Sequence, residues 1–302
     1  MKTRELSRRE FLARTAAVAG GVMLSPLVAK AAVGVTKRTA ADQVTLGKTG
    51  LKLSRLGVGT GSNNGEVQRA LGKDGFNRLI RYAYDKGLTY IDTADAYETH
   101  PFVCDAIKGL PREKLFIQSK MMGSPEKPLA ELDRFRKELG VEYIDSLLVH
   151  CTTEPNWDEE RKRVVDALRE AKDKKIIRAH GVSCHTLPAL KRAVTLDWVD
   201  VHLVRINPQG AVMDTEDMFS QDDPANVPPV MAQLKLMREK KRGVIGMKLI
   251  GNGNFVNPED REKAIRFVMQ SDATDAVVIG FGSTAEIDEA ISRINNALAV
   301  KA

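Results

Sequence analysis

The sequence predicts a closed parallel (β/α)8 barrel, the TIM-barrel architecture, preceded by a β-hairpin and an N-terminal leader. From Leu56 onward, short apolar β-like runs alternate with amphipathic helical stretches, and the runs number eight. The chain has 302 residues, which is one barrel of about 250 residues plus a leader. A doubly wound sheet has the same local pattern, but the count of eight favours the barrel.

The leader carries a twin-arginine motif, Ser7-Arg8-Arg9-Glu10-Phe11-Leu12. A mostly apolar stretch follows from Thr15 to Val28, and then Ala29-Lys30-Ala31, which has the A-x-A pattern of a cleavage site. An amphipathic helix and an uncleaved anchor are the alternatives, but the stretch is short for a span, which needs about 20 apolar residues. We therefore expect a signal peptide over residues 1–31, a linker over 32–43 and the barrel over 44–302.

The leader also holds much of the positive charge. Its six basic and two acidic residues give it +4 of the chain's net +6, so about +2 remains for the rest. This balance gives no support for a nucleic-acid partner. Cys104, Cys151 and Cys184 are widely spaced, which indicates neither a disulfide framework nor a metal site.

The eight predicted strands are apolar runs of barrel-strand length. They are Leu56–Thr60, Thr89–Thr93, Leu115–Lys120, Ile144–His150, Ile177–Ser183, Val199–Asn207, Gly243–Leu249 and Ala276–Phe281. Between them, apolar residues recur at helical spacing in Leu129–Leu139, Asp158–Lys175 and Glu286–Ile294.

Two further segments complete the predicted organisation. Val44 to Ser54, with a glycine-containing turn, reads as a hairpin before the first strand. Pro208 to Pro229 is the longest irregular stretch, and we expect it to lie over the active face, since long loops in compact domains are usually functional or mobile.

Barrel active sites lie at the carboxyl ends of the strands, so the residues that end strands are the candidates for chemistry. The second strand ends in Asp92, with Tyr97 in the loop behind it, and the next two end in Lys120 and His150. Singly, each has a structural explanation, such as a turn cap, loop packing or a core histidine. Because neighbouring strands lie about 4.8 Å apart, the four side chains are expected to converge on one pocket.

The segments around these residues resemble the aldo-keto reductase family. Tyr90-Ile-Asp-Thr-Ala-Asp-Ala-Tyr97 is similar to the signature with the catalytic Asp and Tyr. Phe116–Lys120 and Asp145–His150 resemble the segments with the catalytic Lys and His, and Leu46–Thr60 resembles the opening hairpin and first strand. The resemblance covers roughly residues 44–295. It implies an oxidoreductase that reduces an aldehyde or ketone, or runs in reverse, with Asp92, Tyr97, Lys120 and His150 catalytic.

Chemistry explains why these residue types are needed together. Carbonyl reduction requires a proton donor at the oxygen, and a free tyrosine, with a pKa near 10, is a weak acid at neutral pH. Lys120 is expected to lower the pKa of Tyr97, while Asp92 orients Lys120 and His150 hydrogen-bonds the carbonyl oxygen. Tyr97 is then the general acid, and a cofactor supplies the hydride.

The resemblance also implies a nicotinamide cofactor, NADPH by family habit with NADH possible. Gly59 and Thr60 match positions near the nicotinamide, Ser183 matches a carboxamide-binding hydroxyl, and Lys248 lies in a run that resembles a pyrophosphate loop. Gly282, Ser283 and Thr284 open a helix whose N-terminus suits phosphate, although they are equally a helix cap. Departures from the family pattern are Cys184 for Asn, Leu203 for Gln, Met247 for Tyr and Ala290 for Asn, and no basic residue for a 2′-phosphate is evident.

The sequence is compatible with three functions. The first is an exported carbonyl reductase, whose partners are a small carbonyl substrate and the twin-arginine translocation machinery, located in the periplasm without stable membrane insertion after cleavage. The second is a nicotinamide-binding sensor or accessory protein with little turnover. A phosphate-binding barrel isomerase is the third, and it leaves Tyr97 without a role. Trp157 and His185 fall in loops near the expected pocket, and we interpret both as packing residues.

The leader generates a prediction about location. The double substitution Arg8→Lys/Arg9→Lys is expected to retain the protein in the cytoplasm, because the arginine pair is what the twin-arginine route reads. Cell fractionation of both forms measures this. An equal distribution of the wild type and the variant between the compartments would contradict the prediction.

Overall fold

In the computed structural model, which describes residues 38–218 and 221–299, eight parallel strands close into a barrel. Their order around the ring follows the chain, and β10 pairs with β3 to close it. The strands are β3 (Leu56–Gly59), β4 (Tyr90–Asp92), β5 (Phe116–Met122), β6 (Ile144–Thr152), β7 (Ile177–Cys184), β8 (Val201–Arg205), β9 (Gly243–Met247) and β10 (Ala276–Gly280). The predicted (β/α)8 barrel is confirmed.

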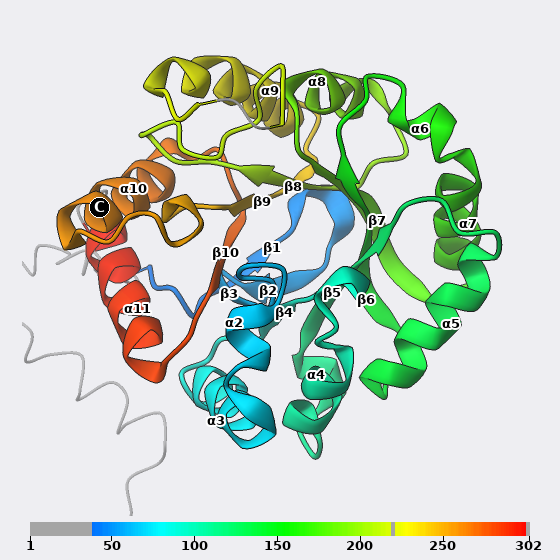
Figure 1. Cartoon of the computed structure of the whole chain (residues 1–302), viewed down its shortest axis with the longest axis horizontal. Coiled ribbons are helices and arrows are strands. Elements are labelled where there is room, and N and C mark those ends of the chain that lie inside the picture. The colour runs from blue at the N-terminus through cyan, green and yellow to red at the C-terminus, as the bar shows by residue number, and fades with distance from the viewer. Residues whose placement is uncertain (1–37, 219–220, 300–302) are drawn as a thin grey trace, which may run out of the picture. The chain divides into compact units, whose positions relative to one another are not determined.

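Helices form the outer layer, and Figure 1 shows them as a ring around the strands. Each strand is followed by one long helix: α3 (Gly72–Asp85), α4 (His100–Ile107), α5 (Pro128–Leu139), α7 (Lys162–Asp173), α8 (Leu187–Thr195), α9 (Val227–Glu239), α10 (Pro258–Ser271) and α11 (Thr284–Ala299). Short helices α2 (Glu66–Arg69) and α6 (Trp157–Glu160) precede α3 and α7. The apolar faces predicted from sequence are buried, as with Leu168 and Ala171 on α7 and Ile287 and Ile294 on α11.

The core has two parts, as a barrel requires. One lies between the strands and the helices, where side chains such as Ile91 and Val182 meet the helical faces. The other fills the barrel interior and includes Tyr90, Phe116 and Ile245. The interior is therefore packed, and an active site can form only at an end of the barrel.

The predicted hairpin is present and covers the amino-terminal end of the barrel. Strands β1 (Gln43–Thr45) and β2 (Lys52–Ser54) pair antiparallel around the 3-10 turn η1 (Gly47–Thr49). Three of its leucines, Leu46, Leu51 and Leu53, pack into the interior core. The Gly47 amide donates to Asp275 at 3.0 Å, at the start of the last strand unit. With this mouth covered, the carboxyl ends of the strands face the open side.

The predicted leader over 1–31 lies outside the described residues, as does much of the linker over 32–43. The described part of the linker packs on the barrel: Ala40 is fully buried, and its amide donates to Asn295 at 2.8 Å. No helix within 38–218 and 221–299 has the length and apolar character needed to cross a membrane.

Several predicted boundaries need correction. Strands β5 and β6 run two residues beyond Lys120 and His150. The strands predicted over Val199–Asn207 and Gly243–Leu249 are shorter than expected, since β8 and β9 cover only Val201–Arg205 and Gly243–Met247. The apolar pattern does not reveal where hydrogen-bond pairing stops, so these ends were wrong by one or two residues.

Two helical boundaries also differ. The expected helix over Asp158–Lys175 breaks at Arg161 into α6 and α7. The irregular stretch ends earlier than Pro229, because η4 (Pro224–Asn226) leads into α9 at Val227. Prolines are tolerated in a first helical turn, where the missing amide hydrogen has no intrahelical partner.

Candidate active site

A buried ion pair joins the ends of β4 and β5. Lys120 is 1% exposed, and its Nζ donates to Asp92 Oδ2 at 2.7 Å and to the Thr93 carbonyl at 2.9 Å. Gln118, two residues before Lys120 and on the same face of the strand, donates to the other Asp92 oxygen at 2.8 Å. The carboxylate is therefore held from both sides and fixes the ammonium at the carboxyl end of the barrel.

Tyr97 is brought to this pair by the turn that follows β4. It ends the 3-10 turn η2 (Asp95–Tyr97), and its hydroxyl lies 3.4 Å from Lys120 Nζ. Gly61, in the loop after β3, lies directly against the phenol ring, because a Cβ there would be 2.4 Å from Tyr97 Cε2. The absence of a side chain at Gly61 thus allows the ring to occupy its position.

His150 completes the predicted group of four. Its ring meets the Tyr97 ring edge-on, with centroids 5.5 Å apart. The β6–β7 register shifts between Val149 and Thr152, and Cys151 has a left-handed φ of 54°, so the strand is irregular where it presents the imidazole. The structure therefore brings Asp92, Tyr97, Lys120 and His150 together, as the sequence predicts.

The electrostatics of the group differ from expectation in one respect. Burial raises the pKa of Tyr97, Lys120 lowers it and Asp92 raises it, and the net shift is upward. Lys120 thus lowers the pKa of Tyr97, as expected, but its effect is outweighed, because the phenol is desolvated and Asp92 offsets the ammonium charge. Tyr97 is protonated at neutral pH, as a proton donor must be.

His150 is neutral at the same pH. Burial, followed by the nearby charges of Lys120 and Arg161, lowers its pKa well below the usual value. Its Nδ1 atom is buried with no hydrogen-bond partner among the described residues. A neutral imidazole still has one N–H to donate, so His150 can bond an oxygen without supplying charge.

Sequence reasoning missed Arg205 and underrated His185. Arg205 ends β8 with 3% exposure, and its Nη2 lies 2.7 Å from His185 Nδ1. His185 lines the cavity beside His150, with ring centroids 6.4 Å apart, whereas Trp157 is buried and donates to the Ala189 carbonyl. The strand-end argument applied to the predicted strand Val199–Asn207 points to Asn207, and only the observed end of β8 points to Arg205.

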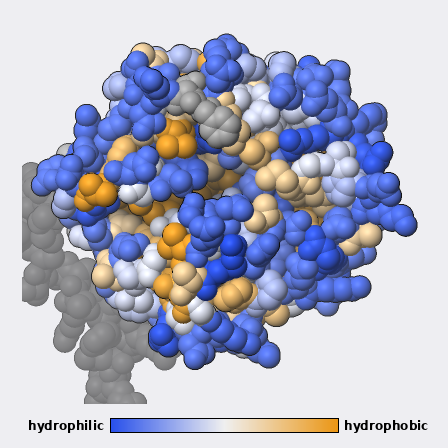
Figure 2. Space-filling model, viewed as in Figure 1, coloured by the Kyte–Doolittle hydropathy of each residue, from blue (hydrophilic) through white to orange (hydrophobic). Residues whose placement is uncertain are grey.

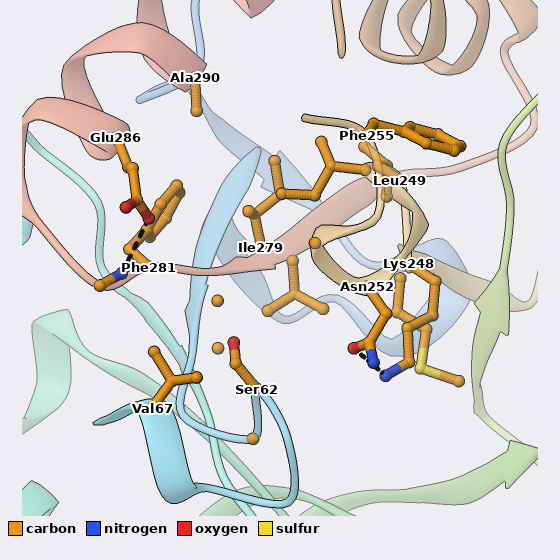
Figure 3. A pocket seen from close by; sticks show the side chains of 18 of the residues that line it. Ser62, Val67, Lys248, Leu249, Asn252, Phe255, Ile279, Phe281, Glu286 and Ala290 are labelled. Atoms are coloured by element: carbon orange, nitrogen blue, oxygen red, sulfur yellow. Dashed lines mark hydrogen bonds between the residues drawn. The ribbon is translucent and has the colours of Figure 1, made fainter. Parts of the chain in front are cut away.

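A cavity of about 580 Å³ extends from Asp92 and Tyr97 to the start of α11. Its walls come from the loops after β3, β9 and β10, as the labelled side chains in Figure 3 show. On the same face, Figure 2 shows hydrophobic residues gathered in a hollow with hydrophilic residues around it. The size lies within the range of about 300–1,000 Å³ typical of small-molecule sites.

The predicted cofactor residues are placed differently around this cavity. Gly59, Lys248 and Gly282 line it. The Thr60 hydroxyl instead forms a buried hydrogen bond of 2.8 Å with the Thr99 hydroxyl. The Ser183 hydroxyl lies 3.4 Å from His185 Nε2. The Ser283 hydroxyl accepts the Glu286 amide at 3.3 Å and so caps α11, and Thr284 borders a separate surface depression beside α3.

The departures from the family pattern fall into two groups. Cys184 and Leu203 are buried, and Thr152 donates to the Cys184 sulfur at 3.4 Å. Met247 and Ala290 line the cavity. The positions that the resemblance assigns to amide side chains near a carboxamide are thus filled by buried, less polar groups.

The cavity suits an elongated, partly anionic ligand such as a dinucleotide. Lys248 Nζ donates to the neutral amide of Asn252 at 2.6 Å and has no carboxylate partner among the described residues. Apolar side chains, among them Val67, Phe255 and Phe281, line the part beyond it. A cation midway, an apolar far end and the tyrosine–lysine pair at the near end fit the pyrophosphate, adenine and nicotinamide of such a cofactor.

The contact of Gly61 with Tyr97 generates a prediction. Gly61→Ala is expected to move the phenol ring by about 1 Å, because a Cβ contact of 2.4 Å must relax to an ordinary one of at least 3.4 Å. A crystal structure of the variant, in which the Lys120–Tyr97 contact has lengthened beyond 3.4 Å, would confirm it. Gly75→Ala, within α3, is the control, and an unmoved Tyr97 ring in Gly61→Ala would show that the loop yields instead.

Comparison with known proteins agrees with this geometry. The chain is 34% identical over 185 residues to "Probable aldo-keto reductase 1" of Glycine max, covering 51% of each chain. It is 29% identical over 171 residues to "NADH-specific methylglyoxal reductase" of Escherichia coli, covering 47% of this chain and 51% of that protein. The chain thus spans about half the length of the curated relatives it matches.

Solved structures show the same fold. A putative aldo-keto reductase from Pseudomonas aeruginosa superposes with a TM-score of 0.67 at 22% identity, over 87% of this chain and 98% of that one. Another, from Bacillus halodurans, superposes with the same TM-score at 16% identity, over 86% and 96% of the two chains. The sequence model described as "Aldo/keto reductase family" matches residues 55–263, well over half of the chain. The chain therefore belongs to the aldo/keto reductase family.

Proposed function

We propose that this protein is a nicotinamide-dependent carbonyl reductase, in which Tyr97 is the general acid. One observation carries the proposal: Lys120 Nζ contacts both Asp92 and the Tyr97 hydroxyl at the end of a cavity of cofactor size. Packing alone does not explain why a buried lysine contacts the hydroxyl of a tyrosine that lines a cavity. The substrate class is an aldehyde or ketone, and the reverse oxidation of an alcohol uses the same groups.

Each side chain has a role that follows from its contacts. A bound reduced nicotinamide supplies the hydride. Tyr97 gives its proton to the carbonyl oxygen, and Lys120 stabilises the phenolate that remains. His150, held neutral by burial, donates a hydrogen bond to the same oxygen and places it. Asp92 holds the ammonium and shields the buried charge.

The names of the matched relatives support this reaction class. They include "Aldehyde reductase" of Saccharomyces cerevisiae, 35% identical over 105 residues, and methylglyoxal reductases of Escherichia coli and Salmonella. Those proteins are named for reducing small carbonyl compounds, and one for using NADH.

A second candidate is a nicotinamide-binding sensor or accessory protein with little turnover. It is favoured by the positions near the expected carboxamide, where Cys184 and Leu203 are buried and the Ser183 hydroxyl lies beside His185. Both candidates bind the dinucleotide, so only turnover with a panel of carbonyl compounds separates them.

We also propose that the protein is exported by the twin-arginine route to the periplasm. The support is the Arg8-Arg9 motif with its apolar stretch and A-x-A site, all of which lie outside the described residues. Export of folded protein with its cofactor bound fits this route, since reduced nicotinamide is scarce outside the cytoplasm.

The proton donor is tested by Tyr97→Phe. This change keeps the ring and its packing but removes the hydroxyl, so carbonyl reduction is expected to fall by about 10²–10⁴ while dinucleotide binding persists. The rate of carbonyl reduction is measured as oxidation of reduced nicotinamide with a carbonyl substrate. Dinucleotide binding is measured by fluorescence titration. Tyr84→Phe is the matched control, because Tyr84 is a partly buried tyrosine of α3 that packs against the core between the strands and the helices.

Lys120→Met is expected to lower the rate of carbonyl reduction by a similar factor. The double variant Tyr97→Phe/Lys120→Met should be little slower than either single variant, because both residues act through one proton transfer. The rate of the wild type should persist to high pH and decline only where Tyr97 ionises, since its pKa is raised. Near-normal turnover of a folded Tyr97→Phe would contradict the assignment, and His150 or the sensor function would then take its place.

Lys248 generates a pH prediction for the cofactor. Burial, followed by nearby Arg205 and Lys120, lowers the pKa of Lys248 to about 8, so it is a cation at lower pH and neutral above. Dinucleotide affinity is therefore expected to weaken as pH rises beyond about 8, with the onset displaced upward because a bound anion stabilises the ammonium.

Dissociation constants measured by fluorescence titration between about pH 6.5 and 10 test this, over the range in which the ammonium titrates. Lys248→Met should bind more weakly and lose the pH dependence, whereas Lys235→Met, an exposed lysine on α9, should behave as the wild type. A pH dependence that survives in Lys248→Met would assign it to another group.

A further inference from the structure

The first turn of α11 is closed by a carboxylate of the chain itself. The Gly282 amide donates to Glu286 Oε2 at 2.8 Å, and the Glu286 amide donates to Ser283 Oγ at 3.3 Å. The arrangement resembles a capping box, except that the Glu286 carboxylate accepts from the amide of Gly282, one residue before Ser283. In Figure 3, Glu286 lies at the edge of the cavity, and a dashed line marks the hydrogen bond that its carboxylate accepts.

The Glu286 carboxylate lies at the end of the cavity that is opposite the catalytic residues. Glu286 and Ala290 line the end of the cavity formed by α11, and Asp92 and Tyr97 line the catalytic end. A dinucleotide with its reactive ring beside Tyr97 therefore has its adenosine near α11. Amides at a helix N-terminus attract phosphate groups, but here the Gly282 amide is already taken by Glu286.

The charges at this end of the cavity are otherwise neutralised. Arg261 donates to Glu289 at 2.8 Å and to the carbonyl of Val256 at 2.7 Å. Arg293 donates to Glu289 at 2.8 Å and to Glu262 at 2.9 Å. Both guanidinium groups are thus engaged by carboxylates, and Glu286 has no ion-pair partner among residues 38–218 and 221–299. Of the charged side chains that line this end of the cavity, Arg261, Arg293, Glu286 and Glu289, Glu286 is thus the one without an ion-pair partner among the described residues.

We propose, on the basis of the proposed function, that Glu286 selects NADH against NADPH. The two cofactors differ by a phosphate on the adenosine ribose, and a dianion beside an unpaired carboxylate is repelled. A ribose with free hydroxyls can instead donate a hydrogen bond to that carboxylate, which is how an acidic residue recognises NAD in other dinucleotide folds. The choice replaces the NADPH expected from family habit.

The test is equilibrium binding to the full chain, independent of turnover. Titration calorimetry or fluorescence gives dissociation constants for NADH and NADPH, and competition with ADP and 2′,5′-ADP isolates the 2′-phosphate. The wild type is expected to bind NADH about tenfold or more tightly than NADPH, which corresponds to about 1.4 kcal/mol. The ratio should shrink at high salt, since exposed charges are screened.

Glu286→Gln separates charge from capping, because the amide oxygen still accepts from Gly282. The variant is expected to bind NADPH and 2′,5′-ADP more tightly and to bind NADH with little change. Its midpoint temperature of unfolding should equal that of the wild type. Glu286→Arg should reverse the preference. Glu259→Gln is the matched control: it removes an exposed acid from the first turn of α10, outside the cavity lining, and should leave the ratio unchanged.

The outcomes separate this inference from the proposed function. A wild type that binds NADPH as tightly as NADH, or a ratio unchanged in Glu286→Gln, overturns the role of Glu286 while dinucleotide binding stands. An equal shift in Glu259→Gln also overturns it, since the effect would then be one of net charge. If neither dinucleotide binds, the proposed function fails and the inference fails with it.

Discussion

The ammonium of Lys120 is almost completely shielded from water. Burial of an isolated charge in such a place destabilises the folded state by several kcal/mol. Asp92 offsets this cost from the neighbouring strand, and Gln118 and the Thr93 carbonyl hold the pair in place. Loss of one partner would leave the other charge buried, at a cost of about 3–5 kcal/mol. The parallel register of β4 and β5 that brings these groups together is thus coupled to the chemistry, and Tyr97 and His150 are arranged around the pair.

Much of this arrangement could be predicted from the sequence, because it depends on periodicity and on strand ends. Eight buried runs with helices between them fix the barrel, and in a barrel the carboxyl ends of strands converge, which locates Asp92, Lys120 and His150. The runs do not reveal where pairing stops, and so β5 and β6 continue past the expected ends. The direction of the pKa shift of Tyr97 was also beyond reach, since it depends on how far Asp92 offsets Lys120 and how completely the ring is buried.

Other features depend on contacts between segments far apart in the chain. Nothing local marks Gly61 as the residue that makes room for the Tyr97 ring, and Arg205 acquires meaning only beside His185. Ser283 and Glu286 have the three-residue spacing of a capping box, so the hydrogen bond from the Glu286 amide to the Ser283 hydroxyl could have been foreseen. The cavity that makes the carboxylate relevant to a ligand could not, because loops after three different strands form its walls.

The hairpin that covers one mouth of the barrel has a consequence for the synthesis of the chain. Gly47 contacts Asp275, 228 residues later, and β3 pairs with β10 to close the ring. A ribosome releases the early segments long before their last partners, so the ring stays open through most of translation, and contacts so distant in sequence form slowly. Until the last strand arrives, β3 has an unpaired edge and the hairpin leucines lack part of their core. Under the export proposed above, a pathway that accepts only folded cargo would therefore have to wait for the final tenth of the chain, although the proposed signal is at the beginning.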